Sequence, residues 1–526
     1  MMFKIVNPRT LRCNITSPSL VRSFFTEQSA VAPLTIHKRQ VKRNNLYGRL
    51  SAVTVTGETV AQTLNDYIRE GNIVKKIELE RYVKELRKYA RFSHALEVME
   101  WMKKRGINFS HSDHAIFLDL ISKVKGTSAA EIYFSDLSSS AKNKFTYGAL
   151  LNCYCKEKLT DKAQSLFQIM DELGIASSMS FNSLMTLYMR LNLPEKVPSL
   201  IQEMKNKNIS PCVFSYNIWM TSYSCINDIE GVERVYEEMI NNGQQCDWTT
   251  YSNMAVAYVK TGLHEKAESA LKKVEEKIQK MGKPRDRTPF HFLLSLYSGT
   301  SNLVEVHRIW NCFKPAFKYT SNTSTLVMLQ ALARLDDVNG LKEVFEEWES
   351  TCSSYDRRLP NTAIAVYLKH DMIEEAENVF HNLVKRCKTP FYWSWGLFMS
   401  YYLEKHQIDL ALRCLEAAIS GINNNEWRPF AADITKFMEY FKKECDVTGA
   451  EKLCEVLKKA NCIDSEAYML LLDVYVAANK TAPQIRCKMK DDGIEISSEL
   501  EDLLSRVCPD SFLIEEGCSS MVLQNN

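Results

Sequence analysis

The sequence of 526 residues lacks several features that would assign it to a class of enzymes or membrane proteins. It contains no run of 18 or more apolar residues, so no segment is predicted to cross a bilayer as a helix. No P-loop, GxSxG nucleophile motif or dinucleotide-binding fingerprint is present. These absences favour a protein that has no catalytic activity of its own and needs no cofactor.

The sixteen cysteines include no CxxC pair that could anchor a zinc ion. Cys153 and Cys155 are two residues apart, which places them on different sides of a helix. In a chain of this length the cysteines are interpreted as reduced, buried, small hydrophobic side chains. The stretch HSDH at 111–114 offers candidate metal ligands, but the simpler interpretation is that Ser112 or Asp113 caps the helix that begins HAIFLDLI. We therefore expect no metal site.

The charges of the chain are nearly balanced, with 66 basic and 64 acidic residues and a formal net charge of +2. The first 26 residues contain Lys4, Arg9, Arg12 and Arg22 and no acidic residue before Glu27. This composition is typical of a mitochondrial or plastid transit peptide, with VRSFFTEQ as the cleavage region; the alternative is a disordered basic N-terminus. Without this segment the formal charge would be −2. Any nucleic-acid site must then come from local arrangement, because bulk charge would not attract a polyanion.

A decapeptide pattern recurs at nearly constant spacing along the chain. Its clearest copies are FTYGALLNCY at 145–154, MSFNSLMTLY at 179–188, FSYNIWMTSY at 214–223 and TTYSNMAVAY at 249–258. The closing position of the pattern recurs at Tyr154, Tyr188, Tyr223, Tyr258, Tyr297, Leu332, Tyr367, Tyr402 and Phe441. A nearly fixed period of this length indicates a solenoid of stacked repeats.

A second amphipathic segment follows each decapeptide. Segments such as DKAQSLF, EKVPSLI, EGVERVY and EKAESAL space their apolar residues three and four apart, as an amphipathic helix does. Asp or Glu just ahead of these segments suits a helix N-terminus. We predict two antiparallel helices in each repeat, joined by a short turn. The steps that end at Tyr297 and at Phe441 are longer than the others and predict longer connectors, one of them around EEKIQKMGKPRDR.

Neither helix of such a pair can bury its apolar stripe alone, so the pairs must stack into a superhelix. Strand signals are nearly absent. The predicted fold is an all-α solenoid of about 11–12 antiparallel helix pairs, with the first helices on the inner, concave surface and the second helices outside. The predicted organisation is a mitochondrial transit peptide at 1–26, an N-terminal linker with capping helices at 27–77, the repeat array at 78–495, and a C-terminal cap and tail at 496–526.

These repeats resemble the pentatricopeptide repeat family, in the P subclass of plain repeats of about 35 residues and in particular its plant organellar members. The resemblance rests on the four decapeptides and on their continuations CKEKLTDKAQSLFQIMDELGI and VKTGLHEKAESALKKV. It is strongest over 144–286 and degenerate after 287, and it implies a right-handed superhelix. The tetratricopeptide repeat, a protein-binding helix pair of similar length, is the alternative, but its tryptophan, Leu-Gly and tyrosine pattern is missing.

The resemblance also implies a set of RNA-binding positions. In that family each repeat reads one base of single-stranded RNA through a polar residue of the first helix and the last residue of the repeat. The first-helix positions match Gly148, Asn182, Asn217 and Ser252, and the last-residue positions match Ser177, Cys212, Asp247 and Asp286. Residues three places before the first-helix positions would stack on or contact neighbouring bases, namely Phe145, Met179, Phe214 and Thr249.

Some of these positions depart from the family pattern. Asn217 with Asp247 is a standard pair that the family's code reads as uracil, and Ser252 with Asp286 looks purine-directed. Gly148 has no side chain and Cys212 is a poor hydrogen-bond partner. After 287 the corresponding places hold His291 and Leu326, which indicate structural spacing. The alternative for every such residue is a polar side chain on the solvated face of an amphipathic helix.

The resemblance implies an organellar single-stranded RNA-binding protein that acts in RNA stabilisation, processing or translation without catalysis. The expected location is the mitochondrial matrix, with the chloroplast as the alternative, and the expected state is a monomer. The zinc deaminase-like signature with which some members of the family end is missing here, so base editing by the chain itself is not expected. The alternative function is a structural component, such as a repeat protein of the mitochondrial ribosome, that binds mainly protein or RNA shape.

Overall fold

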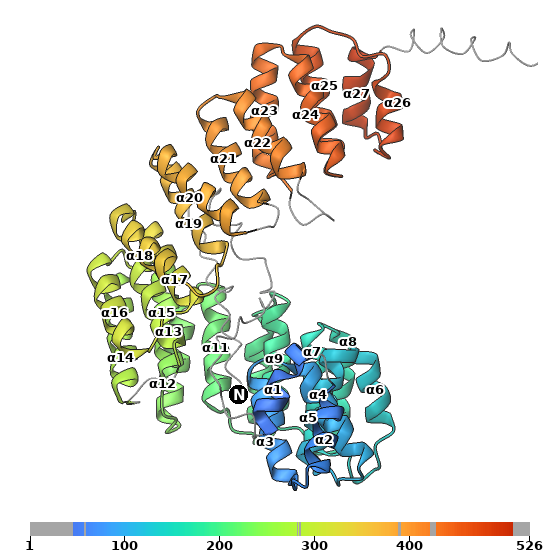
Figure 1. Cartoon of the computed structure of the whole chain (residues 1–526), viewed down its shortest axis with the longest axis vertical. Helices are drawn as coiled ribbons and strands as arrows, with labels where there is room; N and C mark the ends of the chain where they lie inside the picture. The colour runs from blue at the N-terminus through green and yellow to red at the C-terminus, as the bar shows by residue number, and fades with distance from the viewer. Residues whose placement is uncertain are drawn as a thin grey trace, which may run out of the picture. The chain divides into compact units, whose positions relative to one another are not determined.

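A computed structural model describes residues 46–56, 59–280, 282, 286–387, 391–420 and 428–508 of the chain (Figure 1). These residues form 27 helices and no strand, which confirms the predicted all-α class. The predicted transit peptide, the second long connector and the C-terminal tail beyond 508 lie outside the described residues. The chain divides into two compact units, Met1–Lys318 and Tyr319–Asn526, and each is described by itself.

Helices α3 to α26 follow one another as twelve pairs, in agreement with the predicted number. The first helices of the pairs are α3 (Lys76–Lys88), α5 (His111–Lys125), α7 (Lys144–Lys156), α9 (Ser178–Arg190), α11 (Val213–Cys225), α13 (Trp248–Lys260), α15 (Thr288–Gly299), α17 (Asn322–Arg334), α19 (Arg358–Lys369), α21 (Tyr392–Glu404), α23 (Ala431–Glu444) and α25 (Ser465–Ala477). The second helices are α4 (Phe92–Lys104), α6 (Thr127–Ser135), α8 (Thr160–Glu172), α10 (Lys196–Asn206), α12 (Ile229–Asn241), α14 (His264–Lys280), α16 (Leu303–Ala316), α18 (Val338–Thr351), α20 (Ile373–Arg386), α22 (Ile408–Ser420), α24 (Val447–Lys459) and α26 (Ile485–Asp491). The remaining helices are α1 (Leu46–Thr56), α2 (Val60–Arg69) and α27 (Ser498–Val507).

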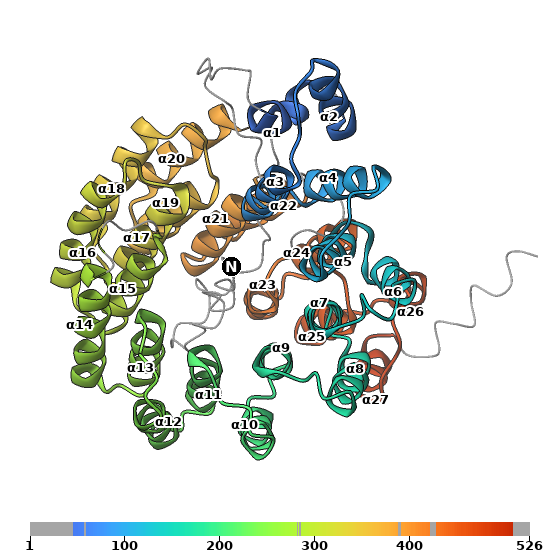
Figure 2. The same ribbon diagram turned by 90° about the horizontal axis from the view of Figure 1, so that it is seen from below.

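Within each unit the first helices form a continuous row. In the first unit α5, α7, α9, α11, α13 and α15 each pack on the next, and in the second unit α17, α19, α21, α23 and α25 do the same. Figure 2 shows α9, α11 and α13 on the inner side of the curve of the first unit, with α10, α12 and α14 outside. The first unit therefore has the predicted inner and outer layers.

The turn inside each pair has a fixed position relative to the closing residue of the decapeptide. Four residues after that closing residue the backbone adopts a positive φ, at Lys158, Asn192, Asn227, Gly262, Ser301, Asp336, Asp371, His406, Cys445 and Asn479. A single left-handed residue of this kind ends a helix tightly, because it lets the next backbone N–H groups reach the last carbonyl groups. The N–H of Leu193, for example, donates to the carbonyl of Tyr188 at 2.9 Å. The short predicted turn is thus built by the backbone.

The closing tyrosines join each repeat to the one before it. The hydroxyl of Tyr258 donates to Glu233 of α12 at 2.9 Å, and the hydroxyl of Tyr297 donates to Glu275 of α14 at 2.6 Å. Tyr475 makes the corresponding bond to Glu451 of α24 at 2.6 Å. Burial raises the pKa of Tyr258, and the neighbouring carboxylate adds to the effect, so the hydroxyl remains a donor. The recurring aromatic residue therefore fixes the stacking of the pairs.

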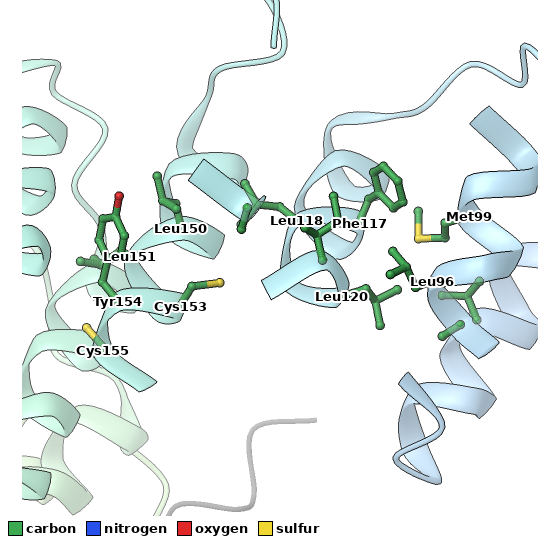
Figure 3. Packing of buried hydrophobic residues seen from close by; sticks show 14 of the residues in the cluster. Leu96, Met99, Phe117, Leu118, Leu120, Leu150, Leu151, Cys153, Tyr154 and Cys155 are labelled. Atoms are coloured by element: carbon green, nitrogen blue, oxygen red, sulfur yellow. The ribbon is translucent and has the colours of Figure 1, made fainter. Parts of the chain in front are cut away.

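The cysteines correct part of the sequence interpretation. All those in the described residues are free thiols, and Cys153 and Cys155 are buried on different sides of α7 (Figure 3). Cys153 lies near Asp119 of α5, and Cys155 lies near Arg190 of α9, as the two-residue spacing predicts. However, Cys225, Cys312, Cys445 and Cys487 are exposed, so not every thiol serves as a buried hydrophobic side chain.

Two further predictions about local structure were wrong. The long step that ends at Tyr297 lengthens the second helix itself: α14 has 17 residues, whereas α8 and α12 have 13. The apolar spacing of EEKIQK continues that of the helix, with Ile278 buried, so these residues stay helical.

The predicted cap of α5, Ser112 or Asp113, is not the residue that caps it. The cap of α5 is Ser110, while Asp113 closes a capping box by accepting from the N–H of Ser110 at 2.8 Å. No helix in the described part of the chain is both long and apolar enough to span a bilayer.

Glycine at the start of α12 allows a close approach between the two helices of its pair. The N–H of Gly231 donates to the cap residue Asp228 at 2.8 Å. A Cβ added at Gly231 would lie 2.7 Å from Cγ of Tyr223, the closing tyrosine of α11. Gly449 is enclosed in the same way by Asp446 and Phe441. By contrast, a Cβ at Gly148 of α7 would meet no atom within 4 Å.

These two kinds of glycine should respond to alanine with opposite signs. Gly231→Ala is expected to lower the free energy of unfolding by about 1–3 kcal/mol, because the methyl group overpacks a rigid ring. Gly148→Ala is expected to raise it by about 0.5–1 kcal/mol, since glycine inside a helix costs backbone entropy and the site is open. Denaturation followed by circular dichroism measures both. Equal responses of the two variants would contradict the packing described for α11 and α12.

Candidate nucleic-acid interface

The predicted first-helix positions lie in register on four consecutive first helices. Gly148, Asn182, Asn217 and Ser252 are the fifth residues of α7, α9, α11 and α13. Asn182, Asn217 and Ser252 are buried side chains, the amide of Asn217 being 6% exposed. Gly148 offers no side chain, but it leaves open space in front of its Cα. The period of the sequence therefore corresponds to a row of equivalent sites in the first unit.

The predicted last-residue positions are the N-caps of the following first helices. Ser177, Cys212 and Asp247 cap α9, α11 and α13. This placement brings Asp247 to Asn217, whose Nδ2 donates to Asp247 Oδ1 at 3.4 Å. It also brings Cys212 to Asn182, with 3.6 Å between Asn182 Nδ2 and the sulfur. Residues 30 apart in the chain thus meet as pairs at the junction of two repeats.

The Ser252 and Asp286 pair is not assembled in this way. Asp286 is exposed, and its carboxylate accepts from the N–H and hydroxyl of Thr288 at 2.9 and 2.7 Å. The Ser252 hydroxyl is buried and has no hydrogen-bond partner in the part of the chain that the structure describes. Because α14 is longer than the other second helices, Asp286 lies farther along the chain, two residues before the start of α15, and its carboxylate accepts from the first N–H of that helix. No contact among the described residues joins Ser252 to Asp286, and the purine-directed pair stays a prediction.

A threonine fixes the polar atoms around Asn217. Asp247 Oδ1 accepts from the backbone N–H and the hydroxyl of Thr250, both at 2.9 Å. Because Thr250 bonds to Asp247, no donor among the described residues reaches the buried Asn217 Oδ1. A buried amide oxygen without a donor costs roughly 1–3 kcal/mol. This site therefore contains a buried acceptor that no donor of the described residues reaches.

The preceding repeat is arranged differently. Ser215, the counterpart of Thr250, donates its hydroxyl to Asn182 Oδ1 at 2.8 Å, so this amide oxygen already has a partner. Burial works to raise the pKa of the Cys212 thiol, but bonds from Ser215, Asn182 and the N–H of Phe214 outweigh it, and the pKa lies below its ordinary value. The Asn182 and Cys212 site is thus more nearly satisfied than the Asn217 and Asp247 site.

The predicted stacking positions differ in exposure. Phe145 and Met179 are 49% and 58% exposed, which is unusual for apolar side chains of this size and leaves them free to contact a base. Phe214 is half-buried. Thr249 is 8% exposed, so it presents little apolar surface, and its hydroxyl has no partner among the described residues. The exposed apolar side chains of the row therefore lie on α7 and α9, with a partly exposed one on α11.

The second unit contains two candidate residues, Asn361 and Trp393, that the sequence reasoning missed. Asn361 lies six residues before Tyr367, the same offset as that of Asn182 from Tyr188. Asn361 Oδ1 accepts from the hydroxyl of Ser394 at 2.7 Å, which repeats the bond between Ser215 and Asn182. Trp393 stands at the stacking offset in α21 and is half-buried. Counting back from Tyr367 and Tyr402 would have found both residues.

A row of basic residues was also missed. Lys156, Arg190 and Lys260 end α7, α9 and α13, each eight residues after a predicted base-reading position. Cys225 occupies the corresponding place in α11. Arg190 is exposed and makes no ion pair in the described residues, whereas Lys260 donates to the carbonyl of Ser224 at 3.3 Å. The recurrence of a basic residue just after the closing tyrosine is the signal that sequence reasoning could have used.

Comparison with known proteins identifies the family. A family model described as PPR repeat matches residues 145–175, 179–209, 214–244, 249–277 and 360–387. Two mitochondrial pentatricopeptide repeat-containing proteins of Arabidopsis thaliana are 47% and 43% identical, and these alignments cover 89% and 92% of this chain and 87% and 96% of the relatives. The large ribosomal subunit protein mL101 of the same plant is 40% identical, over 90% of this chain and 98% of its own length.

The chain is also similar to solved structures. The crystal structure of the pentatricopeptide repeat protein PPR10 from maize matches 90% of this chain and 78% of its own, with 15% sequence identity and a TM-score of 0.41. The fifth matched segment, 360–387, contains Asn361 and lies in the part that the sequence reasoning considered degenerate. With relatives this similar over nearly its whole length, the chain belongs to the pentatricopeptide repeat family.

Proposed function

We propose that this protein binds single-stranded RNA in mitochondria and acts on it by occupancy, without catalysis of its own, as a monomer. The observation that carries the proposal is the Asn217 and Asp247 pair, which two repeats assemble and in which no donor of the described residues reaches the buried Asn217 Oδ1. A base edge that donates a hydrogen bond would satisfy this oxygen. An occupied site of this kind would then hold a transcript against exonucleases or keep it unfolded.

The chemistry of the pair suits uracil. The Watson–Crick edge of uracil carries one N–H donor between two carbonyl acceptors. The donor can reach Asn217 Oδ1, while Asn217 Nδ2, which is only 3.4 Å from Asp247 and therefore weakly bonded, can turn to a carbonyl group. Asp247 itself adds only acceptors and disfavours a base that presents acceptors alone on this side. The identity of the base rests on these contacts together with the family's code.

The flanking residues supply the other parts of an RNA site. Phe145 and Met179 expose apolar surface at adjacent positions of the row, where bases could stack or make apolar contact. Arg190 and Lys260 are the last residues of α9 and α13, the helices that carry Asn182 and Ser252. Cations along the strand can neutralise RNA phosphates. Since the formal net charge of the whole chain is only +2, this local row would provide the electrostatic attraction.

Mitochondrial location is supported by the relatives, two of which carry it in their names. The basic N-terminal segment agrees with import into the matrix. A role as a component of the mitochondrial ribosome is the second candidate, because mL101 is 40% identical over most of both chains. Sedimentation separates the two: stable comigration of the native protein with a ribosomal subunit at high salt would favour the ribosomal role, and small free complexes would favour occupancy of transcripts.

Selection from a random RNA pool tests the reading of a base. The wild-type protein is expected to enrich a sequence with uracil at one fixed position. In the double variant Asn217→Ser with Asp247→Asn, the binding free energy that favours uracil at this position should fall by about 1–3 kcal/mol. The base preferences at the other positions should stay unchanged. Asparagine at 247 keeps a cap for α13, so the fold is retained.

The matched control is Asn241→Ser, which changes an exposed asparagine on the outer helix α12. It should enrich the same sequences as the wild type. The proposal is overturned if the wild-type protein enriches nothing, or if the double variant selects the same base at every position.

A further inference from the structure

Three cations surround one carboxylate at the helices α3, α5 and α7, the last of which also carries Gly148, the first base-reading position. Asp119 of α5 accepts from Arg87 of α3 at 3.0 Å, from Lys123 of α5 at 2.7 Å and from Lys156 of α7 at 3.2 Å. Three consecutive repeats thus contribute one cation each. Other ion pairs of the first unit, such as Lys162 with Glu131 and Lys266 with Glu233, join one cation to one carboxylate. The cluster carries more positive charge than is needed to neutralise Asp119.

The carboxylate is buried, and the three cationic side chains are partly exposed. Asp119 is 7% exposed, whereas the side chains of Arg87, Lys123 and Lys156 are 24%, 26% and 35% exposed. The three partly exposed side chains therefore converge on one buried carboxylate, and the four groups together carry a formal charge of +2. Lys123 is also held over the ring of Phe92 at 4.4 Å, so it has little freedom to turn away. Asp119 fixes the three cations close together against their mutual repulsion.

A group with two negative charges on one phosphorus atom matches this spot better than an internal RNA phosphate. A phosphate monoester carries about −1.5 to −2 at pH 7 and has three oxygens that can each accept from a cation. A diester within the strand carries one charge and two free oxygens. We propose that Arg87, Lys123 and Lys156 form a binding site for a terminal phosphate monoester of the bound RNA. This inference rests on the proposed function.

The position in the row agrees with a strand end. Lys156 ends α7, and Gly148, the first of the base-reading positions, lies eight residues earlier on the same helix. Eight residues of helix span about 12 Å, which two nucleotides can bridge. The other two cations come from α3 and α5, which precede α7 in the array. A strand that passes Gly148 and leaves the reading row would bring its end to this cluster.

The experiment compares RNA ends at constant sequence and salt. An RNA selected by the wild-type protein is made with zero to three extra nucleotides beyond its site, and with a 5′ monophosphate, a 3′ monophosphate or only hydroxyl groups. One phosphorylated end is expected to bind about tenfold more tightly than the hydroxyl form, because it makes charge-assisted bonds to the cluster. Inorganic phosphate at millimolar concentration should reduce that advantage and leave the binding of the hydroxyl form unchanged.

Variants locate the effect. Lys156→Gln, which keeps two cations on Asp119, should abolish the preference for the phosphorylated end. Lys104→Gln, at an exposed lysine that ends α4, should keep it. Equal affinity for all three ends, or a preference that survives Lys156→Gln in a variant that melts like the wild type, overturns the inference. If no RNA binds in any form, the proposed function itself fails, so the two failures are distinguishable.

Discussion

Replacing Phe181 by alanine is expected to lower the free energy of unfolding by about 3–5 kcal/mol. Phe181 of α9 is fully buried, and its ring packs edge-on against Phe167 of α8 with 4.9 Å between centroids. The side chain therefore joins two consecutive repeats, and alanine would leave a cavity at their junction. In a solenoid each repeat is stabilised by its neighbours, so the loss should spread to the α7–α10 segment. Chemical denaturation followed by circular dichroism measures the change.

Met179→Ala on the same helix is the matched control. Met179 is exposed, so its removal should change the stability by less than about 0.5 kcal/mol. If Met179 contacts a base, Met179→Ala should also weaken RNA binding. Phe181→Ala, measured at a low temperature at which it stays folded, should bind RNA like the wild type. Comparable losses of stability in the two variants would contradict the assignment of one residue to the interior and the other to the reading row.

The spacing of the closing residue predicted most of the architecture. Tyr154, Tyr188, Tyr223 and Tyr258 define the helix pairs, because a helix of fixed length and a tight turn repeat at a fixed interval. The left-handed residue that follows each of them could not be recognised by its type, since lysine, histidine and serine occupy that place as well as asparagine and glycine. Only the backbone shows that all of them form the same turn.

The candidate site was predicted in position but not in detail. The resemblance to the pentatricopeptide repeat family placed Asn217 and Asp247 in one site, yet it could not show that Thr250 bonds to Asp247 and that no donor of the described residues reaches Asn217 Oδ1. That outcome depends on which of two acceptors a hydroxyl reaches in space. Asn361 was overlooked for a different reason: the decapeptide around it is weak, although its offset from Tyr367 is intact.

The Asp119 cluster could not be predicted because its members come from three repeats. Arg87, Asp119 and Lys156 are separated by 32 and 37 residues, and of the three only Lys156 belongs to the recurring row of basic residues. Their convergence depends on the packing of α7 on α5 and on the direction of each side chain. A period indicates equivalent places in a repeat, whereas contacts between non-equivalent places need the structure.

Removing the Asp119 carboxylate is expected to destabilise the first unit strongly. In Asp119→Asn the three cations would face one another without a counter-charge, and the free energy of unfolding should fall by about 3 kcal/mol at pH 7. The loss should lie at the lower end for a broken buried ion pair, because the partly exposed cations can move toward water. Asp171→Asn is the matched control: Asp171 pairs with Lys207 at 2.5 Å but both are about one-third exposed, so the loss should stay within about 1 kcal/mol. Urea denaturation of both variants provides the comparison.

The dependence on pH distinguishes an electrostatic role of Asp119 from simple packing. Burial works to raise the pKa of Asp119, but Lys156, Lys123 and Arg87 outweigh it, and the pKa lies below its ordinary value near 4. A carboxyl group with a depressed pKa stabilises the fold fully above the pKa of the unfolded chain, and this stabilisation disappears as the pH falls through the folded pKa. The difference between wild type and Asp119→Asn should therefore be constant from pH 5 to 7 and shrink below about pH 4. A difference that does not change with pH would mean that shape, and not charge, makes Asp119 important.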